Sequence, residues 1–377
     1  MLEDVLNYIK KVENLAKRYA IETKRWQDAS VGNQVYLYGA GYLMPLYFQY
    51  LKCYGIEVTA VIDTFKDGVY QGVPIITLGE FLKRKPVLEN CRFFVSAAGP
   101  SASIIKTLRE LVSLDNIIFV DHAFQLGREK ISLSTYREYL ISKWSEIETL
   151  YYELADEKSK STLLNILREH VSGNPEWLSE TLDSNLDYPE DVIRFGENEI
   201  LVEPGANDGK TFLDFVKRCP KYRGAYLFEP EPQFQTQLNE IASQEVKRGK
   251  EVFVIPKGVW DCETKLSFWS TEEKTGSFMQ ETEKGKLMEL ETTTVDISVP
   301  EAFTYLKMDI EGAEMKALQG TSRHILQHRP KLGISIYHRP TDLLDVWRYL
   351  RSLSPNYHFY LRNHTVLWDD IILYAVP

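Results

Sequence analysis

Ile200-Leu-Val-Glu-Pro-Gly-Ala-Asn-Asp-Gly-Lys210 is the stretch that decides the fold, together with the later run Ala225-Tyr-Leu-Phe-Glu229. Each is a short apolar segment that ends in a carboxylate, Glu203 in the first and Glu229 in the second. A glycine-containing turn follows the first segment, and residues 211–218 have the pattern of a helix. Repeated strand–turn–helix units predict a parallel sheet, in which ligands bind in the crevice outside the carboxyl ends of the strands.

The residue types at these strand ends suit a nucleoside that carries an amino acid. Glycine lets the backbone approach a ligand closely, and a following helix offers free N–H groups to an anion. Glu229 can accept two hydrogen bonds from a ribose diol, and Glu203 can lie near an ammonium group. The spacing differs from the dinucleotide Gly-x-Gly-x-x-Gly pattern, and a purely structural glycine turn is the alternative. The predicted cofactor contacts here are Glu203, Gly205, Ala206, Asn207, Asp208, Gly209, Glu229 and Pro230.

Further motifs follow in order, namely Tyr305-Leu-Lys-Met-Asp-Ile-Glu-Gly-Ala-Glu314, Ile334-Ser-Ile-Tyr-His338, and Phe359-Tyr-Leu-Arg-Asn-His364 before Ile372-Leu-Tyr-Ala375. With the two strand ends, this set resembles the FkbM family of S-adenosylmethionine-dependent methyltransferases over the carboxyl-terminal half of the chain. The resemblance implies a class I methyltransferase fold and S-adenosylmethionine as cofactor. One departure is Glu203-Pro204, where the family more often has Asp and a small apolar residue.

The composition is that of an ordinary globular protein of 377 residues, 44% hydrophobic and 26% charged. A net charge of −10 argues against a protein that binds nucleic acid through its phosphates. No apolar run approaches the length of a membrane span, and the acidic amino terminus is unlike a secretory signal. The widely spaced cysteines, predicted to be free thiols, are Cys53, Cys91, Cys219 and Cys262. We therefore expect a cytoplasmic protein without a membrane span or nucleic-acid partner.

Four segments are expected along the chain. Residues 1–30 carry an amphipathic helix that packs on a neighbouring domain or on a second copy in a homo-oligomer. Residues 31–130 form a Rossmann-like domain, 131–190 a helical connector, and 191–377 the methyltransferase domain. The connector either caps the active site or is a packed spacer.

The predicted fold class is α/β, with two Rossmann-like doubly wound sheets joined by the connector. In the first domain we expect strands at Gln34–Tyr38, Val58–Ile62, Phe93–Ala97 and Ile117–Val120. In the second we expect seven strands with one late antiparallel strand, an extended segment at Lys265–Trp269 and a polar loop at Thr271–Lys286. The later predicted strands are Thr292–Asp296, Tyr305–Met308, Leu332–Ile336, Tyr357–Leu361 and Ile371–Ala375.

The first domain resembles Rossmann-like domains that precede some sugar-modifying enzymes, through Tyr38-Gly-Ala-Gly41, Val61-Ile-Asp63 and Gly72-Val-Pro-Ile75. A dinucleotide-binding turn would have a third glycine at position 44, where this chain has Met44. A nucleotide-sugar or substrate-presenting domain and a degenerate structural domain both remain open.

The chemistry is expected at Asp309 and His338, which follow the fourth and fifth strands of the second domain. A neutral imidazole at His338 could accept the proton of an acceptor hydroxyl, or it could simply hydrogen-bond a loop. Asp309 could orient the acceptor, orient His338, ligate a divalent cation or cap the next helix; we assign no metal. Glu311 and Glu314 lie two and five residues after Asp309, so on a helix the three carboxylates would not all face one way.

Further candidates lie elsewhere in the chain. Gly258 and Val259 follow the third strand, where adenine lies in this architecture, so we predict cofactor contacts there. Arg362 and His364 could reach the same rim. Separate from these, Trp260 and Trp269 could stack on a sugar or pack in the core, and His324 and His328 are expected on a solvated helix face.

The sequence thus predicts an enzyme that moves a methyl group from S-adenosylmethionine to a hydroxyl of a sugar, glycan precursor or related metabolite. The first alternative is a nicotinamide-dependent oxidoreductase that uses Gly39-Ala-Gly41 and Asp63. The second is a non-enzymatic scaffold that binds a sugar nucleotide.

Overall fold

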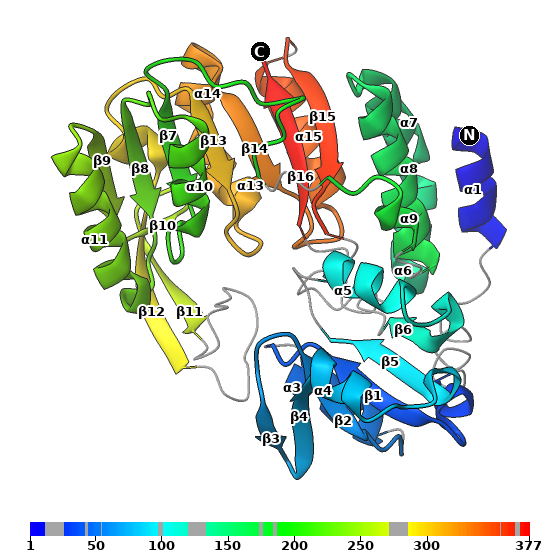
Figure 1. Ribbon diagram of the computed structural model, residues 1–377. Coiled ribbons are helices and arrows are strands. Elements are labelled where there is room, and N and C mark those ends of the chain that lie inside the picture. The colour runs from blue at the N-terminus through cyan, green and yellow to red at the C-terminus, as the bar shows by residue number, and fades with distance from the viewer. Residues whose placement is uncertain are drawn as a thin grey trace.

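Two mostly parallel sheets organise the computed structural model of this protein and confirm the predicted α/β fold class (Figure 1). The structure describes residues 1–11, 26–41, 44–53, 55–96, 101–119, 133–172, 176–183, 187–270, 286–354, 356–365 and 370–377. Within this described part, no helix is long and apolar enough to cross a membrane.

The first sheet has six strands in the order β3-β4-β2-β1-β5-β6, and all neighbours are parallel except β3 and β4. Its strands are β1 (Gln34–Tyr38), β2 (Ala60–Asp63), β3 (Gly68–Tyr70), β4 (Val73–Thr77), β5 (Cys91–Val95) and β6 (Ile117–Phe119). Its helices are α3 (Met44–Cys53), α4 (Leu78–Lys83) and α5 (Ser101–Arg109), with short 3₁₀ turns at Leu88–Asn90 and Leu114–Asn116. The four predicted strands are present, shifted by two residues or fewer at each end, whereas the β3–β4 hairpin was not predicted.

The second sheet has seven strands in the order β15-β16-β14-β13-β7-β8-β9. Its strands are β7 (Ile200–Pro204), β8 (Gly224–Phe228), β9 (Glu251–Ile255), β13 (Tyr305–Met308), β14 (Lys331–Ser335), β15 (His358–Asn363) and β16 (Ile371–Val376). Its helices are α10 (Lys210–Arg218), α11 (Pro232–Lys247), α13 (Glu314–Gln319), α14 (Ser322–His328) and α15 (Asp342–Leu353). Only β16 runs antiparallel to its neighbours, which confirms the expectation of one late antiparallel strand.

A small third sheet, of order β10-β12-β11, is inserted between β9 and β13. It consists of β10 (Gly258–Val259), β11 (Lys265–Ser270) and β12 (Lys286–Thr293), and α12 (Val295–Ser298) follows it. The predicted strand Thr292–Asp296 is therefore wrong in its second half. The Thr294 hydroxyl caps α12 by accepting a hydrogen bond from the Ile297 N–H (3.0 Å), so the chain turns into a helix there. Most of the predicted polar loop, residues 271–285, lies outside the described residues.

The helices that come between the two large sheets in the sequence cover one edge of the seven-stranded sheet (Figure 1). They are α6 (Leu133–Ser142), α7 (Trp144–Glu153), α8 (Glu157–Ser172) and α9 (Glu176–Ser179), joined by the amino-terminal helix α1 (Leu2–Lys11). The α1 side chains of Val5 and Ile9 are fully buried in the same core as α6–α8, and Arg137 donates to the Ile9 carbonyl (2.8 Å). The amino-terminal helix thus packs on the connector of its own chain.

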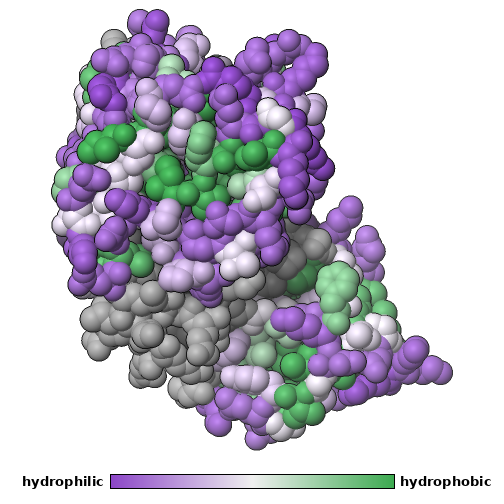
Figure 2. All heavy atoms as spheres, turned by 90° about the vertical axis from the view of Figure 1, so that its left-hand side faces the viewer, coloured by the Kyte–Doolittle hydropathy of each residue, from purple (hydrophilic) through white to green (hydrophobic). Residues whose placement is uncertain are grey.

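The two edges of the seven-stranded sheet differ. Edge strand β15 is covered: the Ala155 N–H donates to the Phe359 carbonyl (2.9 Å), and the Leu361 N–H donates to the Ser159 hydroxyl (2.9 Å). At the other edge, β9 has no further strand beside it among the described residues, and Figure 2, seen from that side, shows a group of apolar residues surrounded by polar ones. Phe253 of β9 is half exposed and stacks on Tyr226 with ring centres 5.0 Å apart.

Candidate active site

The candidate site lies where β7 and β13 are neighbours in the seven-stranded sheet. From β7 the chain moves outward through β8 to β9, whereas β13 leads to the other half of the sheet. The connections therefore leave these two strands in opposite directions and open a crevice at their carboxyl ends, which is where α/β sheets bind ligands. Glu203 is near the end of β7, and Asp309 directly follows β13.

A glycine turn packs tightly between these strand ends. Gly205 has a φ of +83°, and a Cβ there would come within 2.0 Å of the Asp309 carbonyl oxygen, so only glycine fits. The N–H groups of Gly205 and Ala206 both donate to the Phe228 carbonyl (2.9 and 3.0 Å), which ties the turn to the end of β8. The backbone of the turn is thus fixed against both neighbouring strands before any ligand is considered.

Glu229, directly after β8, connects the second strand end to the glycine turn. One carboxylate oxygen accepts the Asn207 N–H (2.9 Å) and the other accepts the Glu231 N–H (2.8 Å). Burial raises the pKa of Glu229 to about 7, although these two hydrogen bonds favour the charged form. Asn207 is exposed with a φ of +46°, Asp208 pairs with Lys210 (2.5 Å), and Pro230 is half-buried. The structure therefore brings together the residues predicted from the two strand ends.

Glu203 lies deeper than expected. Its side chain is fully buried, and neither carboxylate oxygen has a hydrogen-bond partner among the described residues. Burial raises its pKa to about 8, against the attraction of nearby Lys307. Lys307, inside β13, is almost fully buried and lies 3.5 Å from Asp187 and 3.9 Å from Asp309. A lysine in the middle of an apolar strand was a visible signal that the sequence interpretation missed.

Gly258 and Val259 form strand β10 instead of a turn. Both are buried, and they pair in parallel with Thr292 and Thr293 of β12. They come directly after the loop that follows β9, as expected from their position in the chain.

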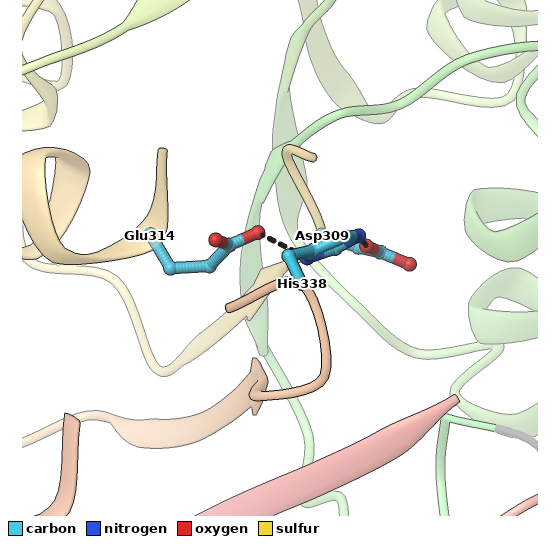
Figure 3. Close-up of side chains that lie close together, drawn as sticks. All are labelled: Asp309, Glu314 and His338. Carbon is cyan, nitrogen blue, oxygen red and sulfur yellow. Dashed lines mark ion pairs between the residues drawn. The ribbon is translucent and has the colours of Figure 1, made fainter. Parts of the chain in front are cut away.

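His338 is surrounded by carboxylates at the end of β14 (Figure 3). Its Nδ1 atom lies 3.0 Å from Glu314, and its Nε2 atom lies 3.4 Å from Asp309 and 3.5 Å from Glu311. The three carboxylates converge because this segment is not a helix, the one case for which they were expected to diverge. Residues 309–313 are a turn, with φ of +62° at Glu311 and +97° at Gly312, and α13 begins only at Glu314.

The surroundings of His338 favour its protonated, charged form, whereas a neutral imidazole was predicted. Burial alone would lower the pKa of His338, but Glu314, Glu311 and Asp309 outweigh it and raise the pKa to about 9. Asp309 also accepts the Tyr337 hydroxyl, at 3.1 and 3.2 Å from its two oxygens. Nearby Asp342 has its pKa raised to about 8 by burial and by Glu314. This end of the site therefore carries an excess of acidic groups.

The remaining predicted candidates have structural roles. Arg362, near the carboxyl end of edge strand β15, is fully buried and donates to Asp156 (2.6 Å) and Asp191 (2.8 Å). His364 contacts the Tyr374 hydroxyl (2.9 Å) and the Asp183 carbonyl (3.1 Å).

The expectation of a solvated face at His324 is wrong. His324 is buried on the Val299 carbonyl (3.0 Å) because its helix, α14, packs against α12, whereas His328 is exposed as predicted. Of the described cysteines, Cys91 and Cys219 are buried free thiols and Cys262 is exposed and free.

Comparison with known proteins identifies a matching family and a related fold. Residues 203–358 match the family described as the methyltransferase FkbM domain, which confirms the predicted resemblance and implies methyl transfer. The crystal structure of methyltransferase FkbM from Methylobacillus flagellatus KT has a TM-score of 0.66 at 23% identity, covers 99% of each chain, and shows a shared fold. Precorrin-6y C5,15-methyltransferase from Geobacter metallireducens GS-15 is a distant similarity, with a TM-score of 0.30 at 10% identity over 51% of this chain and 93% of that one. No curated protein matches the chain.

Proposed function

Because residues 203–358 match the FkbM methyltransferase domain, we propose that the protein transfers a methyl group from S-adenosylmethionine to a hydroxyl group. The acceptor class we propose is a sugar, a glycan precursor or a related metabolite, in the cytoplasm. The observation that carries the proposal is the Glu229 carboxylate, held at the end of β8 and hydrogen-bonded to the glycine turn after β7 (2.9 Å). A carboxylate in that position is suited to a ribose diol.

The residues at the two strand ends fit this cofactor. Each Glu229 oxygen accepts one backbone N–H and keeps a lone pair for a ribose hydroxyl. Glu203, whose carboxylate has no hydrogen-bond partner among the described residues, would be stabilised by the ammonium group of the cofactor in addition to nearby Lys307. We propose further contacts from the backbone of Gly205, Ala206, Asn207, Asp208 and Gly209, from Pro230, and from Gly258 and Val259.

The chain's own part in the reaction is assigned to Asp309 and His338. When bound, S-adenosylmethionine supplies an electrophilic methyl carbon on a positively charged sulfur. Transfer would form a bond between the acceptor oxygen and this carbon while the carbon–sulfur bond breaks, and the hydroxyl proton would leave to a base. Asp309, whose side chain is 28% exposed, orients the acceptor at the end of β13, and buried His338 beside it takes part in removing the proton.

The proposal includes the organisation of the chain. We propose a Rossmann-like domain over residues 31–130 and a methyltransferase domain over residues 191–377. We assign residues 1–30 to an amphipathic helix that packs on the helical connector, residues 131–190, and the connector lies on the edge of the second domain. A small-molecule or glycan acceptor is the partner, and a homo-oligomer is compatible with it.

The test is transfer of a labelled methyl group. The full chain is incubated with methyl-labelled S-adenosylmethionine and fractionated extract from the source organism, and the labelled product is identified by mass spectrometry. We expect an O-methylated metabolite, and we expect His338→Ala to lower turnover roughly 100-fold or more without changing affinity for S-adenosylhomocysteine. Absence of a labelled product in every fraction, despite cofactor binding, would overturn the proposal in favour of a binding scaffold.

A further inference from the structure

Asp309, Glu314 and His338 come from three different elements and meet at one point (Figure 3). One possible ligand atom from each residue can be chosen so that all three lie within 4.8 Å of one another. Bonds of roughly 2.0–2.2 Å to a cation place its ligand atoms about 3 Å apart when adjacent and about 4.4 Å apart when opposite. The three side chains therefore need only small adjustments to surround one ion.

The polar atoms of this cluster are not satisfied by the protein itself. His338 is 4% exposed, yet neither ring nitrogen has a hydrogen bond of acceptable geometry among the described residues. The short approach of Glu314 to Nδ1 (3.0 Å) lacks the direction of a hydrogen bond. The second oxygen of fully buried Glu314 also has no hydrogen-bond partner in the described part of the chain. Burying polar atoms without partners costs free energy, and a bound ligand would supply the missing partners.

The charge of the cluster points to a cation. Three carboxylates, from Asp309, Glu311 and Glu314, approach the His338 ring within 3.5 Å. One imidazolium cannot neutralise this set, whereas a divalent cation carries two charges and lets the imidazole coordinate as a neutral ligand.

We propose that Asp309, Glu314 and His338 bind one divalent cation. Two carboxylates and one imidazole favour an ion that accepts both oxygen and nitrogen, so Mn²⁺ is the probe of choice. Asp309 and Glu311 have side chains that are 28% and 34% exposed, which leaves the outer side of the cation open.

The role of the cation rests on the proposed function, although its binding does not. An acceptor hydroxyl on the open side of the cation would have its pKa lowered, so its proton would leave more readily to water, and His338 would assist by holding the cation rather than by taking the proton itself. The acceptor would also be held at the end of β13, beside the glycine turn where we place the cofactor.

The direct test is a titration of the full chain with Mn²⁺, followed by electron paramagnetic resonance of the free ion and by calorimetry. We expect one saturable site per chain, reversed by a chelator, and affinity at least tenfold weaker in Asp309→Asn and in Glu314→Gln. Glu289→Gln, an exposed carboxylate on β12, is the matched control and should bind Mn²⁺ as the unchanged chain does. Glu314 also accepts the Ile310 N–H (2.9 Å), so the Glu314→Gln variant could unfold, and circular dichroism checks that it is folded. If it is unfolded, the Mn²⁺ affinity of Asp309→Asn alone decides whether the site exists.

Saturable Mn²⁺ binding that is weakened by Asp309→Asn supports the site. If, in addition, no acceptor is methylated, the proposed function is overturned but the cation site is not. Unsaturable binding, or equal affinity in Asp309→Asn and the unchanged chain, would overturn the site. Methyl transfer that continues undiminished in chelator would leave the proposed function standing without the cation.

Discussion

Gly205 is the residue with the least freedom at the site, because its backbone conformation and its surroundings both exclude a side chain. We predict that Gly205→Ala lowers the free energy of unfolding by roughly 2–3 kcal/mol and weakens S-adenosylhomocysteine binding, since the turn must move away from Asp309. Gly249→Ala is the matched control: it has the same φ of +83° but nothing within 4 Å of the added Cβ. It should cost about 1 kcal/mol. Urea unfolding and calorimetry measure both quantities, and equal losses in the two variants would contradict the clash.

Glu229 combines the proposed ribose contact with the fixing of the turn. We predict that Glu229→Ala weakens S-adenosylhomocysteine binding by roughly 1–3 kcal/mol, because a charge-assisted hydrogen-bonded pair is lost. Glu229→Gln keeps one acceptor oxygen and should lose less. Titration calorimetry compares the two variants, and affinity that is the same in all three proteins would remove Glu229 from the cofactor site.

Glu203 should make stability depend on pH. Its pKa is raised from an ordinary 4.5 to about 8, so the folded state holds a proton more tightly than the unfolded state between these values. The stabilisation is complete below about pH 4.5 and is lost as pH rises through about 8. Glu203→Gln removes this loss, so its stability relative to the unchanged chain should improve by a few kcal/mol between pH 5 and pH 8.5.

The groups that face Glu203 are Lys307, Asp187, Asp309, Tyr188 and Tyr305, and all of them are unchanged in the Glu203→Gln variant. Urea unfolding at the two pH values gives the difference. Exposed Glu240→Gln is the control and should change stability little at either pH. A Glu203→Gln difference that stays constant with pH would show that Glu203 is charged in the folded protein.

At the scale of elements, Arg362 joins edge strand β15 to the connector. It donates to Ser159 of α8 (2.8 Å), to Asp156 just before α8, and to Asp191. We predict that Arg362→Met lowers the free energy of unfolding by roughly 3 kcal/mol, because it leaves acidic groups without their buried partner. Arg351→Met breaks an Arg–Glu153 pair (2.8 Å) that is half exposed, so it should cost at most about 1 kcal/mol. Hydrogen exchange should show α8 losing protection only in Arg362→Met.

The sequence predicted best the elements that are buried on both faces. β7, β8 and β13 are short, mostly apolar segments with every residue buried, and such segments have few other structural solutions. The β3–β4 hairpin was missed because it lies at a sheet edge: Val69 is 71% exposed, and the alternation that marks a strand is weak there.

The sequence predicted those residues of the candidate site that directly follow a strand. Glu229, Asp309 and His338 follow strands whose positions were correct, so their common edge could be inferred. The convergence of Glu311 and Glu314 on His338 could not, because it depends on the left-handed turn at Glu311 and Gly312, which no pattern in the sequence reveals. The burial of Glu203 depends on tertiary packing that no local pattern carries.

For the molecule as a whole, the open question is what the first domain contributes beside the methyltransferase domain. Asp63 lies where a dinucleotide-binding acid would meet a ribose, but its carboxylate is used internally. It accepts the N–H groups of Ala40 (2.7 Å), Phe65 (2.9 Å) and Lys66 (3.0 Å). The Lys66 ammonium group also donates to the Ala40 carbonyl (2.7 Å), so the chain closes its own glycine turn. A ribose would have to displace these contacts.

We therefore predict that nicotinamide cofactors leave the unfolding of the protein unchanged, whereas S-adenosylhomocysteine stabilises it. Ligand at about 100 times its dissociation constant adds roughly 2.7 kcal/mol to the free energy of unfolding, which a thermal scan detects readily. The two sheets have separate cores, so the scan should show the stabilised transition moving while the other stays in place. Glu229→Ala should abolish the shift. A shift with NAD or NADP that persists in Glu229→Ala would instead assign a working dinucleotide site to the first domain and revive the oxidoreductase alternative.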